Sequence, residues 1–320
     1  MIEPVALRSQ VNIEELLTMA ACDAAWEGGK AHDERDAESV PRGVGALATL
    51  SSLQYMISGV LFELQRSGFY LEGSLHDRLV DLMGEGDSVI SYNYDLLIDF
   101  ALTKAGKASS ANYAVEFSNA LDGAEYGPSE LEPYEDQRSG PVDVLKLHGS
   151  LNWLQLKHEE LRSTTEFRKT QHPVFYLRDA YDVVVPAGAF GWGFSLEREE
   201  YKRDDIHYVE LVPVIVPPTF DKAEVWRARG GMFRRLWSRA KAALAGCERV
   251  VLIGHSLREA DYQTRWLFRA SLAARRPGPE ITIVNPSPGD RARLHTFFES
   301  LGSVQTLSTV EDLLQVRPAV

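Results

Sequence analysis

The chain contains very little cysteine. Only Cys22 and Cys247 occur among its 320 residues, which excludes a disulfide framework and a four-cysteine zinc site. The eight histidines are scattered, and no H-x-x-x-H or C-x-x-C spacing occurs, so the sequence predicts no metal site. Sparse cysteine is typical of a reducing compartment, and we expect a cytoplasmic protein.

Long apolar runs and an excess of basic residues are also lacking. No stretch approaches the roughly 18 consecutive apolar residues of a membrane helix. The first residues, MIEPVALRSQVN, have neither the basic nor the apolar region of a signal peptide. The net charge is −12, whereas nucleic acids and anionic membranes require a basic face. We therefore expect neither of these partners, although 44% hydrophobic residues provide an ample core.

The apolar spacing divides the chain into a helical first part and an alternating second part. We predict mainly helices over residues 1–86, and irregular insertions over 106–140 and 157–210. The later elements are predicted as strands at 142–156, 211–220, 249–257 and 280–288 and helices at 226–246, 260–274 and 290–302. Such alternation indicates an α/β fold, with a parallel sheet wrapped by helices, and we expect one domain over residues 1–320.

Small or polar residues follow the apolar strands at the points where the strands end. In parallel sheets, ligands bind at the carboxyl ends of the strands, so this coincidence predicts a site. The residues are Asn93 and Asp95 in VISYNYDLLIDFAL, His148 in KLHGS, Thr219, Gly254 and Ser256 in IGHSL, and Asn285.

Each of these residues also has a structural interpretation. Asn93 and Asp95 could simply cap the helix that follows them. His148 could be structural or solvated, although its ordinary pKa suits proton transfer near neutrality. IGHSL is no nucleophile elbow, because Arg258 stands where that motif needs glycine. It is either a Gly-x-Ser turn that approaches a phosphate or ribose, or an ordinary tight turn with His255 as a loop residue.

Taken in order, six segments resemble the sirtuin-like domain of bacterial antiphage-defence proteins. The similarity covers about residues 11–300, since VNIEELLTM also fits the early helix of that group. The segments are SYNYDLLID, LKLHGSLNW, PVIVPPTFDK, LWSRAKAAL, VVLIGHSLREADYQTRWLFRASL and ITIVNPSP.

The resemblance implies a Rossmann-like parallel sheet with helices on both faces that binds NAD as its substrate. It implies a cytoplasmic NAD glycohydrolase, an effector that depletes NAD and acts with an activating protein partner or as a homo-oligomer. It also implies that Asn93 orients water and the nicotinamide ribose, that Asp95 lies near the carboxamide, and that His148 is the catalytic base. Gly254 and Ser256 would approach phosphate and ribose, Asn285 would lie near the adenine ribose, and Thr219 would belong to the cofactor-binding set.

Two departures from the family pattern affect these expectations. The four-cysteine zinc module of deacylating sirtuins is missing, which disfavours deacylation. The opening strand and glycine-rich turn that hold the pyrophosphate are missing too, since RGVGAL at 42–47 follows no buried strand. Either the natural chain begins upstream of Met1, which we favour, or this is a degenerate copy. The alternative function is a catalytically silent module that binds NAD or ADP-ribose and regulates a partner.

Overall fold

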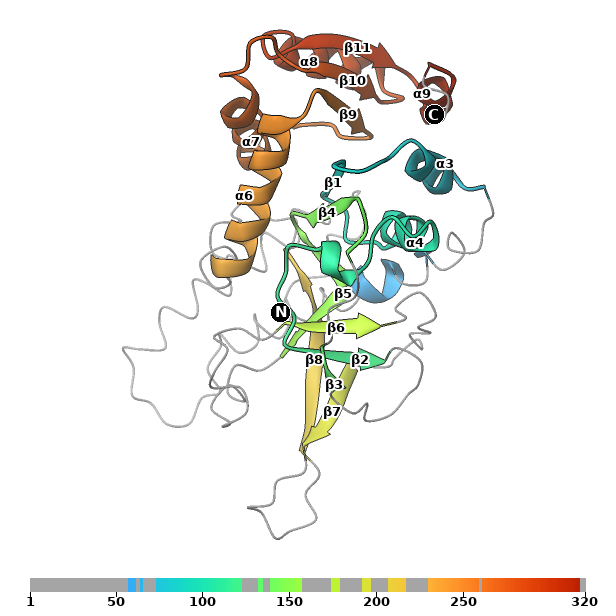
Figure 1. Ribbon diagram of the computed structural model, residues 1–320, viewed down its shortest axis with the longest axis vertical. Coiled ribbons are helices and arrows are strands. Elements are labelled where there is room, and N and C mark those ends of the chain that lie inside the picture. The colour runs from blue at the N-terminus through green and yellow to red at the C-terminus, as the bar shows by residue number, and fades with distance from the viewer. Residues whose placement is uncertain are drawn as a thin grey trace, which may run out of the picture.

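The protein is a mixed α/β chain with parallel sheets and several helices (Figure 1). The computed structural model describes residues 57–61, 64–65, 73–122, 132–134, 139–156, 174–178, 192–196, 207–216, 230–258 and 261–316. Helical residues at 57–61 and 64–65 come first. The later helices are α3 (Leu75–Asp81), α4 (Leu97–Lys104), the 3-10 helix η2 (Ser110–Asn112), α6 (Gly230–Gly246), α7 (Tyr262–Leu272), α8 (Pro288–Phe298) and α9 (Val310–Val316).

The described strands form three sheets, two of which are wholly parallel. The first pairs β1 (Ser88–Ser91) with β4 (Asp143–Lys146). The second has the order β11 (Ser303–Leu307), β10 (Glu280–Val284), β9 (Arg249–Ile253). The third has the order β3 (Glu132–Pro133), β2 (Asn119–Asp122), β6 (Phe175–Arg178), β5 (Gly149–Leu156), β8 (His207–Ile215), β7 (Trp192–Leu196).

Local sequence explains where several elements begin. Ser74 and Asp77 form a capping box on α3, each side chain accepting the other residue's backbone N–H at 3.2 Å. The hydroxyl of Ser287 accepts the N–H of Asp290 at the start of α8. Pro288 occupies the first turn, where its lack of an N–H leaves no donor unsatisfied. β9 and β10 are rich in valine and isoleucine, which suit extended backbone.

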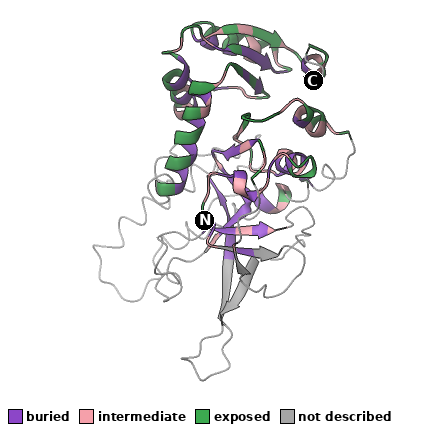
Figure 2. Cartoon of the chain, viewed as in Figure 1, coloured by how far each residue is buried: buried purple, intermediate pink, exposed green. Residues whose placement is uncertain are grey.

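One apolar core joins the two parallel sheets. α6 packs against both β4 and α7, and its buried residues include Phe233 and Leu236, one turn apart. The same core contains Leu145 of β4 and Ile283 of β10. Figure 2 shows the buried residues along β4 and the inner side of α6, so this helix connects the β1–β4 pair to the β9–β11 sheet.

The predicted alternation over the last third of the chain is confirmed: α6, β9, α7, β10 and α8 lie within or close to the predicted ranges. The prediction of irregular structure over 157–210 is wrong, because this range contains β6, β7 and the start of β8. Residues 106–140 likewise contribute β2 and β3. β6 pairs with β2 and β8 pairs with β5, and both pairs join segments more than 50 residues apart, which local sequence patterns do not show.

β9 is buried on one face only, whereas strands of a parallel sheet wrapped by helices are usually buried on both. Val251 and Ile253 are 40% and 42% exposed, whereas Val250 and Leu252 belong to the core. Among the described strands, β9 has a neighbour on one side only, namely β10. None of the described helices is long and apolar enough to cross a membrane.

Candidate functional site

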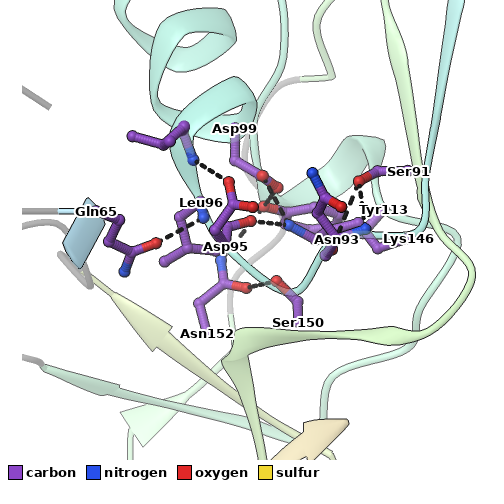
Figure 3. A network of polar contacts seen from close by, with 11 residues as sticks. Gln65, Ser91, Asn93, Asp95, Leu96, Asp99, Tyr113, Lys146, Ser150 and Asn152 are labelled. Carbon is purple, nitrogen blue, oxygen red and sulfur yellow. Dashed lines mark hydrogen bonds and ion pairs between the residues drawn. The ribbon is translucent and has the colours of Figure 1, made fainter. Parts of the chain in front are cut away.

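The carboxyl ends of β1 and β4 lie at the same level. The two strands pair in parallel, with Ser91 opposite Lys146. Asn93 lies two residues after Ser91, and His148 lies two residues after Lys146. The N–H of Leu147 continues the ladder by donating to the carbonyl of Ser91 at 2.9 Å. Asn93 itself is exposed, and its N–H donates to the hydroxyl of Ser91 at 3.1 Å (Figure 3). The register therefore brings two predicted site residues to one edge.

Tyr92 connects this edge to the end of β9. Its ring makes an edge-to-face contact with the imidazole of His148, with centroids 5.2 Å apart, and a second with that of His255 at 5.0 Å. The loops after β1, β4 and β9 thus meet at one tyrosine. We call Tyr92, Asn93, His148 and His255 the strand-end cluster. His255 and Tyr92 were not predicted to belong to it, although both occupy strand-end positions in the sequence.

The backbone around His148 is fixed by a turn that requires glycine. Gly149 has φ +90°, and a Cβ added there would lie 2.0 Å from the carbonyl oxygen of Val214. The carbonyl of His148 accepts the N–H of Val216 at 2.7 Å, and the carbonyl of Val216 accepts the hydroxyl of Tyr94. Val216 therefore ties the loops after β1 and β4 to the end of β8.

Asp95 does not cap α4, because the N-cap is Leu96 and no side chain caps it, but Asp95 makes a local bond just before the helix. Its carboxylate accepts the N–H of Leu97, the first residue of α4, at 3.1 Å. Its backbone carbonyl also accepts the ammonium of Lys146. Asp95 therefore helps to start α4, and its role near a nicotinamide carboxamide stays a prediction.

A buried ion pair that the sequence analysis did not identify joins the end of β4 to α4 (Figure 3). The Nζ of Lys146 lies 2.9 Å from Oδ2 of Asp99, and the two side chains are 0% and 1% exposed. Tyr113 donates its hydroxyl to the other carboxylate oxygen at 2.5 Å, and Asn152 donates to Tyr113 at 3.3 Å. The signal in the sequence was a lysine inside the apolar run VDVLKL, which a buried partner must neutralise.

The loop after β9 is held in a strained conformation. Gly254 has φ +68°, and Leu257, which is not glycine, has φ +44°. The N–H of Leu257 donates to Nδ1 of His255 at 2.8 Å, so Nδ1 carries no proton and the neutral ring is protonated at Nε2. Arg293 donates to the carbonyl of Ser256 at 2.6 Å. Hydrogen bonds therefore hold the segment from Gly254 to Leu257, while its approach to a phosphate or ribose stays a prediction.

Asn285 supports this loop from the end of β10. It is 4% exposed, donates from Nδ2 to the carbonyl of His255 at 3.1 Å and accepts the N–H of Ser287 at 2.8 Å. These bonds give Asn285 a structural role, while its contact with an adenine ribose stays a prediction. Thr219, the remaining predicted residue, lies outside the described residues.

Cysteine and metal chemistry have no support in the described part of the chain. There, no three histidine, cysteine or acidic side chains are grouped so that they could hold a metal ion. Burial raises the pKa of the Cys247 thiol despite the opposing charge of Arg275, so this thiol is a poor nucleophile at neutral pH.

No family model matches this chain, and no curated protein matches it either.

Breaking the buried ion pair should be costly. Lys146→Met leaves the Asp99 carboxylate buried without its counter-charge, and we expect a loss of about 3–5 kcal/mol in the free energy of unfolding by urea. The double variant Lys146→Met with Asp99→Leu should lose clearly less. Lys104→Met is the matched control, because its ion pair with Asp77 is exposed and worth at most about 1 kcal/mol. Equal losses for the single and double variants would contradict this interpretation.

Tyr92 should make the free energy of unfolding fall at alkaline pH. Burial, with a smaller contribution from the charge of Asp261, raises the pKa of Tyr92 above its ordinary value, so the folded protein keeps this proton longer than the unfolded chain. The resulting stability is present below about pH 10 and is lost as pH rises beyond it. Tyr92→Phe should therefore lose less stability than the wild type in urea titrations between neutral and strongly alkaline pH. Identical pH slopes would refute the assignment.

Proposed function

We propose that the protein is an NAD glycohydrolase of sirtuin-like, Rossmann-like architecture. The two parallel sheets support this proposal through their winding. Within the first sheet β1 pairs in parallel with β4, and within the second the chain passes from β9 to β10 and then to β11. In doubly wound folds, ligands bind where the strand order reverses, at the carboxyl ends of the strands. In such a fold the reversal would fall between β1 and β9.

The strand-end cluster is the observation that carries the proposal. The contacts of Tyr92 with His148 and His255 bring the carboxyl ends of β1, β4 and β9 together. Two imidazoles therefore lie against the residue that precedes Asn93, and Leu257, two residues after His255, has a strained positive φ. Strained loops of this kind cluster at functional sites, because their cost persists only where the surrounding structure enforces it.

The chemistry suits these side chains. Hydrolysis breaks the bond between C1′ of the ribose and the nicotinamide nitrogen, and the electron pair leaves with the already cationic ring. Water adds to C1′ and loses a proton, giving nicotinamide, ADP-ribose and H⁺. Asn93 would hold the ribose and water in line without adding charge. His148 would accept the proton, and Asp95 would orient the carboxamide.

The remaining parts of the proposal follow from the resemblance. The backbone of the Gly254–Ser256 turn would approach phosphate and ribose, with Thr219 and Asn285 completing the cofactor-binding set. The cellular role would be NAD depletion in bacterial antiphage defence, in the cytoplasm, triggered by a protein partner or by homo-oligomer assembly.

A second candidate function rests on the free edge of β9. Among the described strands nothing pairs with β9 on the side away from β10, and Val251 and Ile253 are exposed on one face of this strand. A glycine-rich turn that holds the pyrophosphate would belong at this position in a dinucleotide-binding sheet. Without it, the chain would bind NAD or ADP-ribose and regulate a partner without catalysis.

Removing the proposed base, His148, or the proposed amide, Asn93, should slow turnover strongly. We expect His148→Ala and Asn93→Ala to release nicotinamide from NAD about 10²–10⁴-fold more slowly than the wild type, measured by chromatography. His295→Ala is the matched control, because this histidine lies on α8, where it contacts Glu299 on the surface. Turnover at the wild-type rate in either variant would contradict the catalytic role proposed for the substituted residue.

Binding and release together distinguish the two functions. Calorimetry with NAD and with ADP-ribose measures binding, and nicotinamide release measures catalysis. Binding accompanied by release supports the glycohydrolase, whereas binding without release supports the regulatory module. Absence of both would remove the two proposals together.

A further inference from the structure

We propose that Tyr92 is a positioning residue that holds the imidazoles of His148 and His255 in one site through its ring. His148 follows β4 and His255 follows β9, and these two strands belong to separate sheets. Tyr92 follows β1. The interplanar angles are 77° with His148 and 73° with His255, so both contacts have the edge-to-face geometry that aromatic pairs prefer. The inference rests on the proposed function for its consequence in catalysis, but not for the contacts themselves.

The hydroxyl of Tyr92 does not explain this placement. It is buried, and it makes no hydrogen bond of normal geometry to any described residue, although Thr264 and Asp261 are its polar neighbours. A buried hydroxyl without a bond destabilises the folded state. The ring is therefore the part of Tyr92 that carries the positioning role, and phenylalanine should replace it.

The two imidazoles are not equivalent, and this gives Tyr92 a specific task. His255 accepts the N–H of Leu257 at Nδ1, so proton uptake at that atom would break a bond inside a strained turn. The contact with Tyr94, at a centroid distance of 6.5 Å, supports the ring of His148 from a second direction. Tyr92 thus keeps the proposed base, His148, close to the imidazole of His255, whose tautomer is fixed. Loss of the Tyr92 ring should displace both imidazoles.

Substitutions that separate the ring from the hydroxyl test this inference. Tyr92→Leu should lower kcat for nicotinamide release about 100-fold, the scale of a displacement of roughly 1 Å, and should change the pH profile of kcat/KM. Tyr92→Phe should retain wild-type kcat and pH profile. Tyr262→Leu is the matched control, because Tyr262 is 75% exposed on α7. Tyr92→Met provides a flexible apolar replacement if the leucine variant does not fold.

A second measurement on the ligand-free protein does not depend on the proposed function. NMR signals of the ring nitrogens of His148 and His255 should both shift in Tyr92→Leu or Tyr92→Met and stay unchanged in Tyr92→Phe and Tyr262→Leu. Wild-type ring signals and wild-type kcat in the leucine and methionine variants would overturn the inference. If even the wild type releases no nicotinamide, the proposed function fails, and the ring signals alone decide the role of Tyr92.

Discussion

The buried ion pair between Lys146 and Asp99 is the constraint on which the candidate site depends. It joins β4 to α4 inside the core, where neither charge has access to water. Two charges in such a place are tolerated only when they are paired and further hydrogen-bonded, as Tyr113 and the carbonyl of Asp95 provide here. Because Lys146 stands two residues before His148, the same pair fixes where β4 ends.

The site above this pair is built from backbone restraints more than from contacts among its side chains. The turn at Gly149 and the bonds of Val216 hold the loop of His148, and the strained Leu257 with Arg293 and Asn285 holds the loop of His255. Tyr92 then bridges the two loops. Such preorganisation suits a reaction in which positioning supplies much of the rate.

The sequence predicted what depends on local pattern. The order of α6, β9, α7, β10 and α8 followed from apolar periodicity, and the register of β1 with β4 puts Asn93 and His148 at the same edge of the pair. Of the six-stranded sheet, β5 and most of β8 lie in predicted strands, whereas β2, β3, β6 and β7 lie in ranges predicted as irregular, and β11 and α9 were not predicted. The contacts of Tyr92 with two histidines also depend on tertiary packing, which spacing along the chain does not encode.

A crystal structure of the His148→Ala variant with NAD would locate the binding site, because the variant should bind the dinucleotide without cleaving it. We expect the nicotinamide ribose to lie beside Asn93 and the space left by the imidazole of His148, with the phosphates near Gly254 and Ser256. NAD at the opposite, amino ends of β9 and β10, in the hollow lined by Arg249, Arg275 and Arg276, would contradict it.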